Sequence, residues 1–157
     1  MTNKIEAEAL QALEEKPWFA GGLRFTCTGC GKCCTGPADS IYLSRRDVSR
    51  LSKALSLPVD TFIRDYTRLS EGRRVLLDKP SSSDCVFLSG TACSVYDARP
   101  TQCRTYPFWL TNILEPEDWT AAAELCEGIN HPDAPLLSPA EILEQCRSDL
   151  ENETLTP

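Results

Sequence analysis

Long apolar runs are missing from this sequence of 157 residues. No stretch approaches the roughly 20 apolar residues that a membrane-spanning helix needs, so we expect no membrane insertion. The polar, acidic residues 1–10 lack the apolar core of a secretory signal, and we therefore expect a cytoplasmic protein. Histidine is also scarce: the single His131 lies in a proline-containing loop, and we predict that it is not a metal ligand.

The sequence is also short of positive charge, with a formal net charge of -7. Residues 45–74 hold eight basic and four acidic side chains, but no basic run is continuous and no aromatic stacking pattern accompanies them. We therefore predict that the protein does not bind nucleic acid.

Several cofactor motifs are absent as well. Residues 29–32 read Gly-Cys-Gly-Lys and lack the Gly-x4-Gly-Lys spacing of a phosphate loop. The sequence contains no glycine-rich turn from strand to helix for S-adenosylmethionine and no Cys-x3-Cys-x2-Cys motif of radical enzymes.

With no internal repeat and no low-complexity linker, the chain is predicted to be one small α+β domain over residues 1–157. Its core is expected over residues 18–130, with flanking helices at 3–16 and 139–152. We expect short helices around a β-hairpin, with irregular loops organised by a cysteine-ligated metal centre.

Capping and turn signals predict the smaller elements. Ser44 and Asp47 form a capping box for a helix to about residue 56, and Ser138 with Glu141 forms another for the last helix. A further helix should open at Pro58, with candidate core contacts at Phe62, Tyr66 and Leu69. Strands are predicted at 41–43 and 73–77, and a hairpin at 85–96 with a three-residue turn at Ser89-Gly90-Thr91.

The sequence is unusually rich in cysteine, with nine residues in total. Residues 27–34 read Cys-Thr-Gly-Cys-Gly-Lys-Cys-Cys, and thiols this closely spaced on a glycine-bearing turn suit a metal better than a disulfide. A reducing compartment disfavours disulfides, and an odd number of cysteines cannot all be paired in disulfides. We therefore predict a metal site.

Adjacent Cys33 and Cys34 point in different directions in most backbone conformations and are awkward ligands for one tetrahedral ion. Remote thiols would complete the coordination, whereas Cys146 falls on the apolar stripe of the last helix and is predicted to be structural. Positive charge from Lys32, Arg99 and Arg104 could offset the thiolates. The candidate metal ligands are Cys27, Cys30, Cys33, Cys34, Cys85, Cys93, Cys103 and Cys126.

The spacing leaves the metal open between zinc and iron. Cys-x2-Cys-x2-Cys matches the first three ligands of a bacterial ferredoxin run, but Cys34 comes too early to be the fourth. Zinc needs no redox partner and accepts four thiolates from dispersed positions. We therefore favour a zinc ion, with iron or an iron–sulfur cluster as the alternative.

Together with the segment at 27–34, several further motifs resemble the CxxCxxCC (YkgJ-like) family of proteins described as zinc- or iron-chelating. They are Cys85-Val-Phe-Leu, Ala-Cys93-Ser-Val-Tyr, Arg99-Pro-x-x-Cys103-Arg and Tyr106-Pro-Phe-Trp. The resemblance covers about residues 24–128 and implies metal chelation by the same eight cysteines. The family commonly has Pro-Gly after its last cysteine, where this chain has Glu127-Gly128.

Three functional hypotheses follow. The first is a metal-binding protein whose centre is structural or serves metal handling. The second is an iron–sulfur-dependent enzyme or an accessory factor for protein modification, because the resemblance extends to proteins that carry this cluster in a flagellin lysine N-methylase; Cys34 would then be its reactive thiol. The third is a zinc-stabilised interaction module, in which aromatic side chains bind a protein partner: Trp18, Phe19, Trp109 and Trp119.

Overall fold

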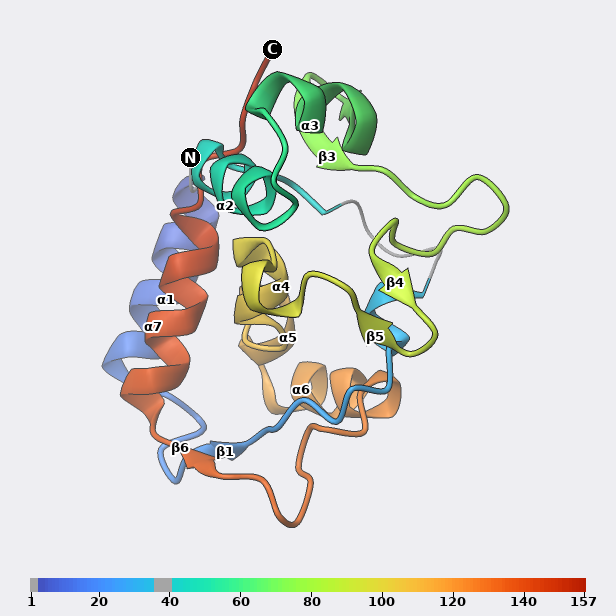
Figure 1. Cartoon of the computed structure of the whole chain (residues 1–157). Coiled ribbons are helices and arrows are strands. Elements are labelled where there is room, and N and C mark those ends of the chain that lie inside the picture. Colours follow the sequence, from blue (N-terminus) through green and yellow to red (C-terminus); the bar gives the residue numbers. More distant parts are fainter. Residues whose placement is uncertain (1–2, 36–40) are drawn as a thin grey trace. The chain divides into compact units, whose positions relative to one another are not determined.

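The computed structural model describes residues 3–35 and 41–157 and has an α+β fold of short helices and antiparallel strand pairs (Figure 1). The chain divides into two compact units. The first unit is Met1–Thr28 with Thr105–Glu151, and the second unit is Gly29–Arg104 with Asn152–Pro157. The chain therefore passes from the first unit to the second inside the cysteine-rich segment.

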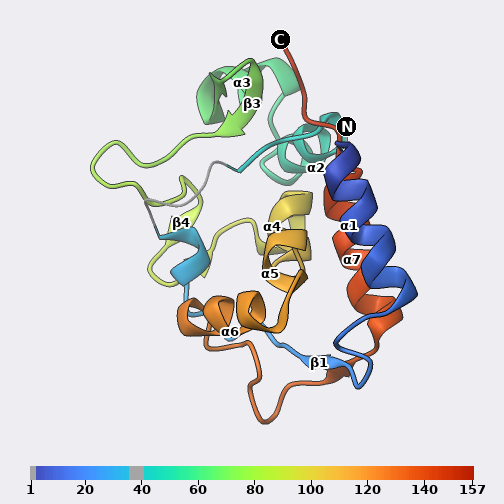
Figure 2. The same ribbon diagram turned by 180° about the vertical axis from the view of Figure 1, so that it is seen from behind.

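Two long helices, α1 (Lys4–Glu15) and α7 (Pro139–Leu150), pack beside each other in the first unit. They are the blue and red helices that lie together in both Figure 1 and Figure 2. The Ser138 hydroxyl accepts a hydrogen bond from the Glu141 backbone N–H at 3.3 Å. Both flanking helices and the capping box of α7 are therefore confirmed.

The rest of the first unit consists of α5 (Leu110–Ile113), α6 (Pro116–Leu125) and a pairing of β1 (Leu23–Arg24) with β6 (Leu136–Leu137). These elements enclose a hydrophobic core of their own, because the apolar faces of α1, α6 and α7 meet the loop aromatics. Its fully or nearly buried members include Leu13, Phe19, Phe108, Ile113, Trp119, Ile142 and Cys146.

The second unit is built from shorter elements around a separate core. In chain order they are η1 (Lys32–Cys34), α2 (Arg45–Ala54), α3 (Val59–Tyr66), β2 (Thr67–Ser70), β3 (Arg73–Leu76), β4 (Leu88–Ser89), β5 (Ala92–Cys93), η2 (Tyr96–Ala98) and α4 (Thr101–Thr105), whose last residue belongs to the first unit. The buried core residues are Leu43, Val48, Leu51, Phe62, Leu76, Phe87, Val95 and Ala98. Stacked rings of Phe62, Tyr66 and Phe87 extend this core.

The structure corrects three predictions in the second unit. Leu69 is 46% exposed because it lies in β2, an unpredicted strand that turns into β3 through Glu71 and Gly72, both with positive φ. In the β4–β5 hairpin Ser89 pairs with Ala92, so the turn has two residues and not three. Residues 41–43 form no regular strand, although Tyr42 bridges to Val75 beside β3.

The four aromatic residues considered for partner binding do not share one environment. Phe19 and Trp119 are buried, at 2% and 4% exposed, whereas Trp18 and Trp109 are half-buried. The Trp18 indole N–H donates to the Ile113 carbonyl at 2.9 Å. Among the described residues, no helix combines the length and the apolar character required to cross a membrane.

Candidate metal centre

The cysteine-rich segment forms a tight turn that we call the knuckle (residues 29–35). Gly31 has φ +74° and precedes η1, and its carbonyl accepts hydrogen bonds from the Cys34 N–H at 3.0 Å and the Thr35 hydroxyl at 2.9 Å. A Cβ at Gly31 would lie 2.6 Å from the Thr91 carbonyl oxygen. Glycine is therefore required here for both the backbone conformation and the close approach to the hairpin turn.

A backbone hydrogen bond ties the knuckle to the segment that leads into the hairpin. The Cys85 N–H donates to the Cys34 carbonyl at 2.8 Å. Cys93, on β5, is paired with Leu88 across the hairpin. The backbone thus brings three of the predicted ligand positions into one part of the second unit.

A fourth position, Cys103, lies on α4 and is half-buried. Burial raises the pKa of its thiol, and the negative charges of Cys85, Cys33 and Cys93 raise it further. Burial likewise raises the pKa of Cys85, with further contributions from Cys93 and Cys33. Negative charge on one of these thiols therefore opposes ionisation of the others. We call these five residues the thiol cluster: Cys33, Cys34, Cys85, Cys93 and Cys103.

Cys33 and Cys34 form a coupled pair, with their Sγ atoms 4.0 Å apart. A hydrogen bond from the Cys34 thiol to Cys33 lowers the pKa of Cys33 to about 6, against an opposing effect of burial; the charge of Arg99 also favours the Cys33 anion. The same bond raises the pKa of Cys34. The exposed Cys33 therefore carries negative charge more readily than Cys34.

Two more predicted ligands, Cys27 and Cys126, lie in the first unit, on segments that run beside each other. The Thr26 N–H donates to the Gly128 carbonyl at 3.1 Å, and the Thr28 hydroxyl donates to the Glu127 carboxylate at 2.9 Å. A Cβ at Gly128 would lie 2.0 Å from the Thr26 carbonyl oxygen, so this position needs glycine. The Glu127 carboxylate, which follows Cys126, thus binds to the segment that carries Cys27.

The eight predicted ligands thus divide into Cys27 and Cys126 in the first unit and the other six in the second. Cys30 is half-buried and lies in the knuckle. Within residues 3–35 and 41–157, no three cysteine, histidine, aspartate or glutamate side chains form a ready-made metal shell, and no cysteine is in a disulfide. Cys146 is fully buried in the core of the first unit, as predicted for the apolar stripe.

The basic residues near the thiol cluster also make structural contacts. The Arg99 guanidinium lies 3.7 Å above the Tyr96 ring and donates to the Tyr96 carbonyl at 2.8 Å. Arg104 donates to the Arg99 carbonyl at 3.1 Å and to the Asp97 carbonyl. Arg99 acts electrostatically on Cys33 and Cys103, which agrees with its predicted role in offsetting thiolate charge, while Lys32 is exposed.

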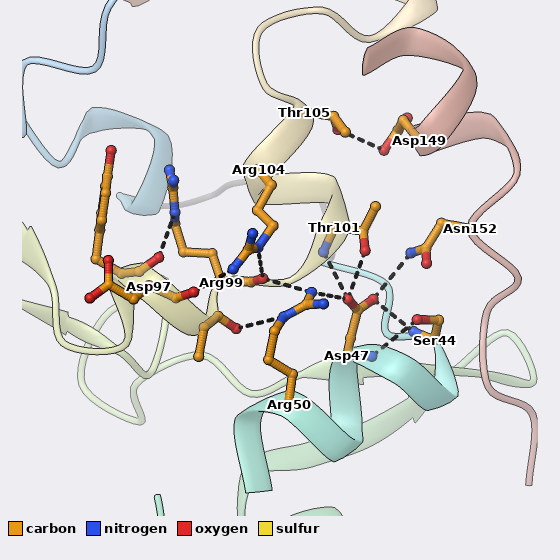
Figure 3. A network of polar contacts seen from close by, with 12 residues as sticks. Ser44, Asp47, Arg50, Asp97, Arg99, Thr101, Arg104, Thr105, Asp149 and Asn152 are labelled. Carbon is orange, nitrogen blue, oxygen red and sulfur yellow. Dashed lines mark hydrogen bonds and ion pairs between the residues drawn. The ribbon is translucent and has the colours of Figure 1, made fainter. Parts of the chain in front are cut away.

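Sequence reasoning missed the long-range role of Asp47, which it identified only as part of a helix cap. The carboxylate is fully buried and bonds to Thr101 and Asn152, far away in sequence (Figure 3). A polar residue on the apolar face of a helix was the available signal, since Asp47 lies four residues before buried Leu51. No local pattern identifies its distant partners.

Comparisons with known proteins identify a family and one similar protein. The family model CxxCxxCC, described as a "putative zinc- or iron-chelating domain", matches residues 26–127. An uncharacterized protein of Methanocaldococcus jannaschii is 28% identical over 92 residues, or 57% of this chain and 48% of the relative. The chain thus spans about half the length of that relative. No solved structure shows a significant match.

Proposed function

The chain belongs to the CxxCxxCC family, and on this basis we propose that its cysteines hold a metal ion, with zinc favoured over iron. The proposed ligands are the eight cysteines of the family motif. The observation that carries the proposal is the contact between the knuckle and the segment before the hairpin. The Cys85 N–H donates to the Cys34 carbonyl at 2.8 Å, and the Cys33 and Cys34 Sγ atoms lie 4.0 Å apart.

The donor set fits such an ion in kind and in number. A structural zinc site uses four thiolates, and the thiol cluster supplies five sulfurs. Four thiolates on one Zn²⁺ leave a net charge of about -2, which the Arg99 guanidinium would partly offset. The proposed role of the ion is to cross-link three segments that few regular hydrogen bonds connect. Cys27, Cys30 and Cys126 are proposed as further ligands from the family motif.

Elemental analysis and absorption spectroscopy of protein purified without oxygen test the proposal. We expect at least one tightly held zinc ion per chain and no visible absorption. Brown protein with thiolate-to-iron charge-transfer bands would instead support the iron–sulfur alternative. Protein that contains no metal and still unfolds cooperatively would overturn the proposal.

A pair of cysteine variants locates the ion. Cys103→Ser removes a sulfur of the thiol cluster, so we expect loss of tightly bound metal. Cys146→Ala is the matched control, because its thiol is buried in the core of the first unit and is expected to leave metal content unchanged. Equal metal content in both variants would show that Cys103 is not a required ligand of the ion.

A further inference from the structure

Asp47 is a fully buried carboxylate that accepts five hydrogen bonds. Its Oδ2 accepts from the Ser44 N–H at 3.0 Å and the Asn152 amide at 3.1 Å. Its Oδ1 accepts from Arg50 at 2.6 Å and from the Thr101 N–H and hydroxyl at 2.9 and 2.8 Å. Figure 3 shows these donors converging on the one side chain from α2, the start of α4 and the segment after α7.

A buried charge is costly unless every lone pair is used. Burial by itself would raise the pKa of Asp47, but the hydrogen bonds from Ser44, Asn152 and Thr101 outweigh it and lower the pKa. The carboxylate is therefore ionised and paired with Arg50, whose side chain is 32% exposed.

Helix capping involves only one of the two Asp47 carboxylate oxygens. A capping box needs one carboxylate oxygen for the backbone N–H of the cap residue, and Oδ2 fills that role for Ser44. Oδ1 takes no part in the cap and accepts hydrogen bonds from the N–H and the hydroxyl of Thr101, the first residue of α4. Cys103, a member of the thiol cluster, follows two residues later on this helix.

Arg50 extends the contact toward the thiol cluster. Besides Asp47, its guanidinium donates to the carbonyls of Arg99 at 2.9 Å and Ala98 at 3.4 Å. The Arg99 carbonyl also accepts from Arg104, so two guanidinium groups hold the backbone of the residue whose own side chain acts on Cys33. The loop and the first turn of α4 are thus fixed by side chains from α2.

We propose that Asp47 and Arg50 are positioning residues of the metal centre, which set the places of the Cys103 sulfur and the Arg99 guanidinium. This inference rests on the proposed function. It assigns to the polar network a role outside the coordination shell: to preorganise a ligand-bearing helix that is only five residues long.

Cobalt-substituted protein provides the test, because the visible spectrum of Co²⁺ reports the geometry of its thiolate ligands. For Asp47→Asn we expect a shifted spectrum and about tenfold weaker zinc binding in competition with a chelator, the loss usual for outer-shell partners. Thr101→Val keeps the backbone bond and removes only the hydroxyl, so it should cause a smaller shift in the same direction. Ile142→Ala is the control for lost stability alone, since Ile142 is buried in the core of the first unit.

The outcomes separate the two proposals. If wild-type protein binds metal and both Asp47→Asn and Thr101→Val keep its spectrum and affinity, Asp47 is only structural and this inference is wrong. If Asp47→Asn does not fold, the test rests on Thr101→Val alone: a changed spectrum and affinity support the inference, and an unchanged spectrum and affinity refute it. If Ile142→Ala weakens metal binding as much as the network variants do, the effect comes from stability and the inference fails. Wild-type protein without any metal affinity overturns the proposed function as well.

Discussion

Single side chains in this protein are placed by partners that are distant in sequence. Asp47 is the clearest case, because a carboxylate with no exposed surface depends on donors from three separate segments. Its role as a cap is visible in the sequence, since Ser44 and Asp47 have the required spacing. Its bonds to Thr101 and Asn152 are not predictable, because they exist only once the chain has folded.

Asp47 should make stability depend on pH in the acid range. Its folded pKa lies below the unfolded value of about 3.9, so its ionised form stabilises the folded state. This contribution is complete above the unfolded pKa and is lost as the pH falls through the folded pKa. Urea unfolding should show Asp47→Asn about 3 kcal/mol less stable than wild type at pH 7. The difference should shrink below about pH 4, and a constant difference down to pH 2 would contradict the assignment.

Cys146 should be the thiol least accessible to an alkylating reagent. It is fully buried, and burial raises its pKa to about 12. Iodoacetamide at pH 8, followed by peptide mass spectrometry, should leave Cys146 unmodified in native metal-free protein and label it only in denaturant. Cys27, which is exposed, serves as the internal reference. Labelling of both at equal rates would show that the core of the first unit opens readily.

Among the elements, the longer helices were predictable, whereas α5 and the short strands were only partly so. Capping boxes and prolines mark the ends of α2, α6 and α7 in the sequence itself. Strand β2 escaped prediction because its four residues follow α3 directly, with no break between them. The candidate site was predictable as a set of cysteines, but their division between two units depends on tertiary contacts.

The knuckle offers a test of close packing between elements. Gly29 and Gly31 have similar φ values, +70° and +74°, but only Gly31 has a neighbour that an added Cβ would meet. Gly29→Ala should cost about 1–2 kcal/mol, the strain of a left-handed residue. Gly31→Ala should cost about 1–3 kcal/mol more, because the Thr91 backbone must move. Equal losses by urea unfolding would mean that the knuckle does not rest on the hairpin.

At the scale of the whole molecule, each unit has its own hydrophobic core. The core of the first unit uses the long helices α1 and α7, whereas the thiol-bearing part of the second unit contains only strands of two residues and short helices. Hydrophobic burial therefore supports the first unit well, and the proposed metal would matter most where regular structure is scarce.

Metal removal should thus affect the two units unequally. After treatment with a chelator under reducing conditions, hydrogen–deuterium exchange should rise in residues 85–104 and stay low in α1 and α7. Reloading with zinc should restore protection. Unchanged exchange in residues 85–104 would show that the fold of the second unit does not depend on a metal.

The path of the chain through the two units also sets the order in which their parts are synthesised on the ribosome. Every member of the second core lies between Leu43 and Ala98, and the last member of the thiol cluster is Cys103, so one unbroken stretch of synthesis delivers them all. Helix α1 is synthesised first but can pack only after α7, which is synthesised near the end. Asn152, which bonds to Asp47, is synthesised after α7. Proteins fold from their N-terminal side as they are made. The cysteines of the thiol cluster are therefore synthesised before Asn152, whose hydrogen bond to Asp47 completes the polar network last.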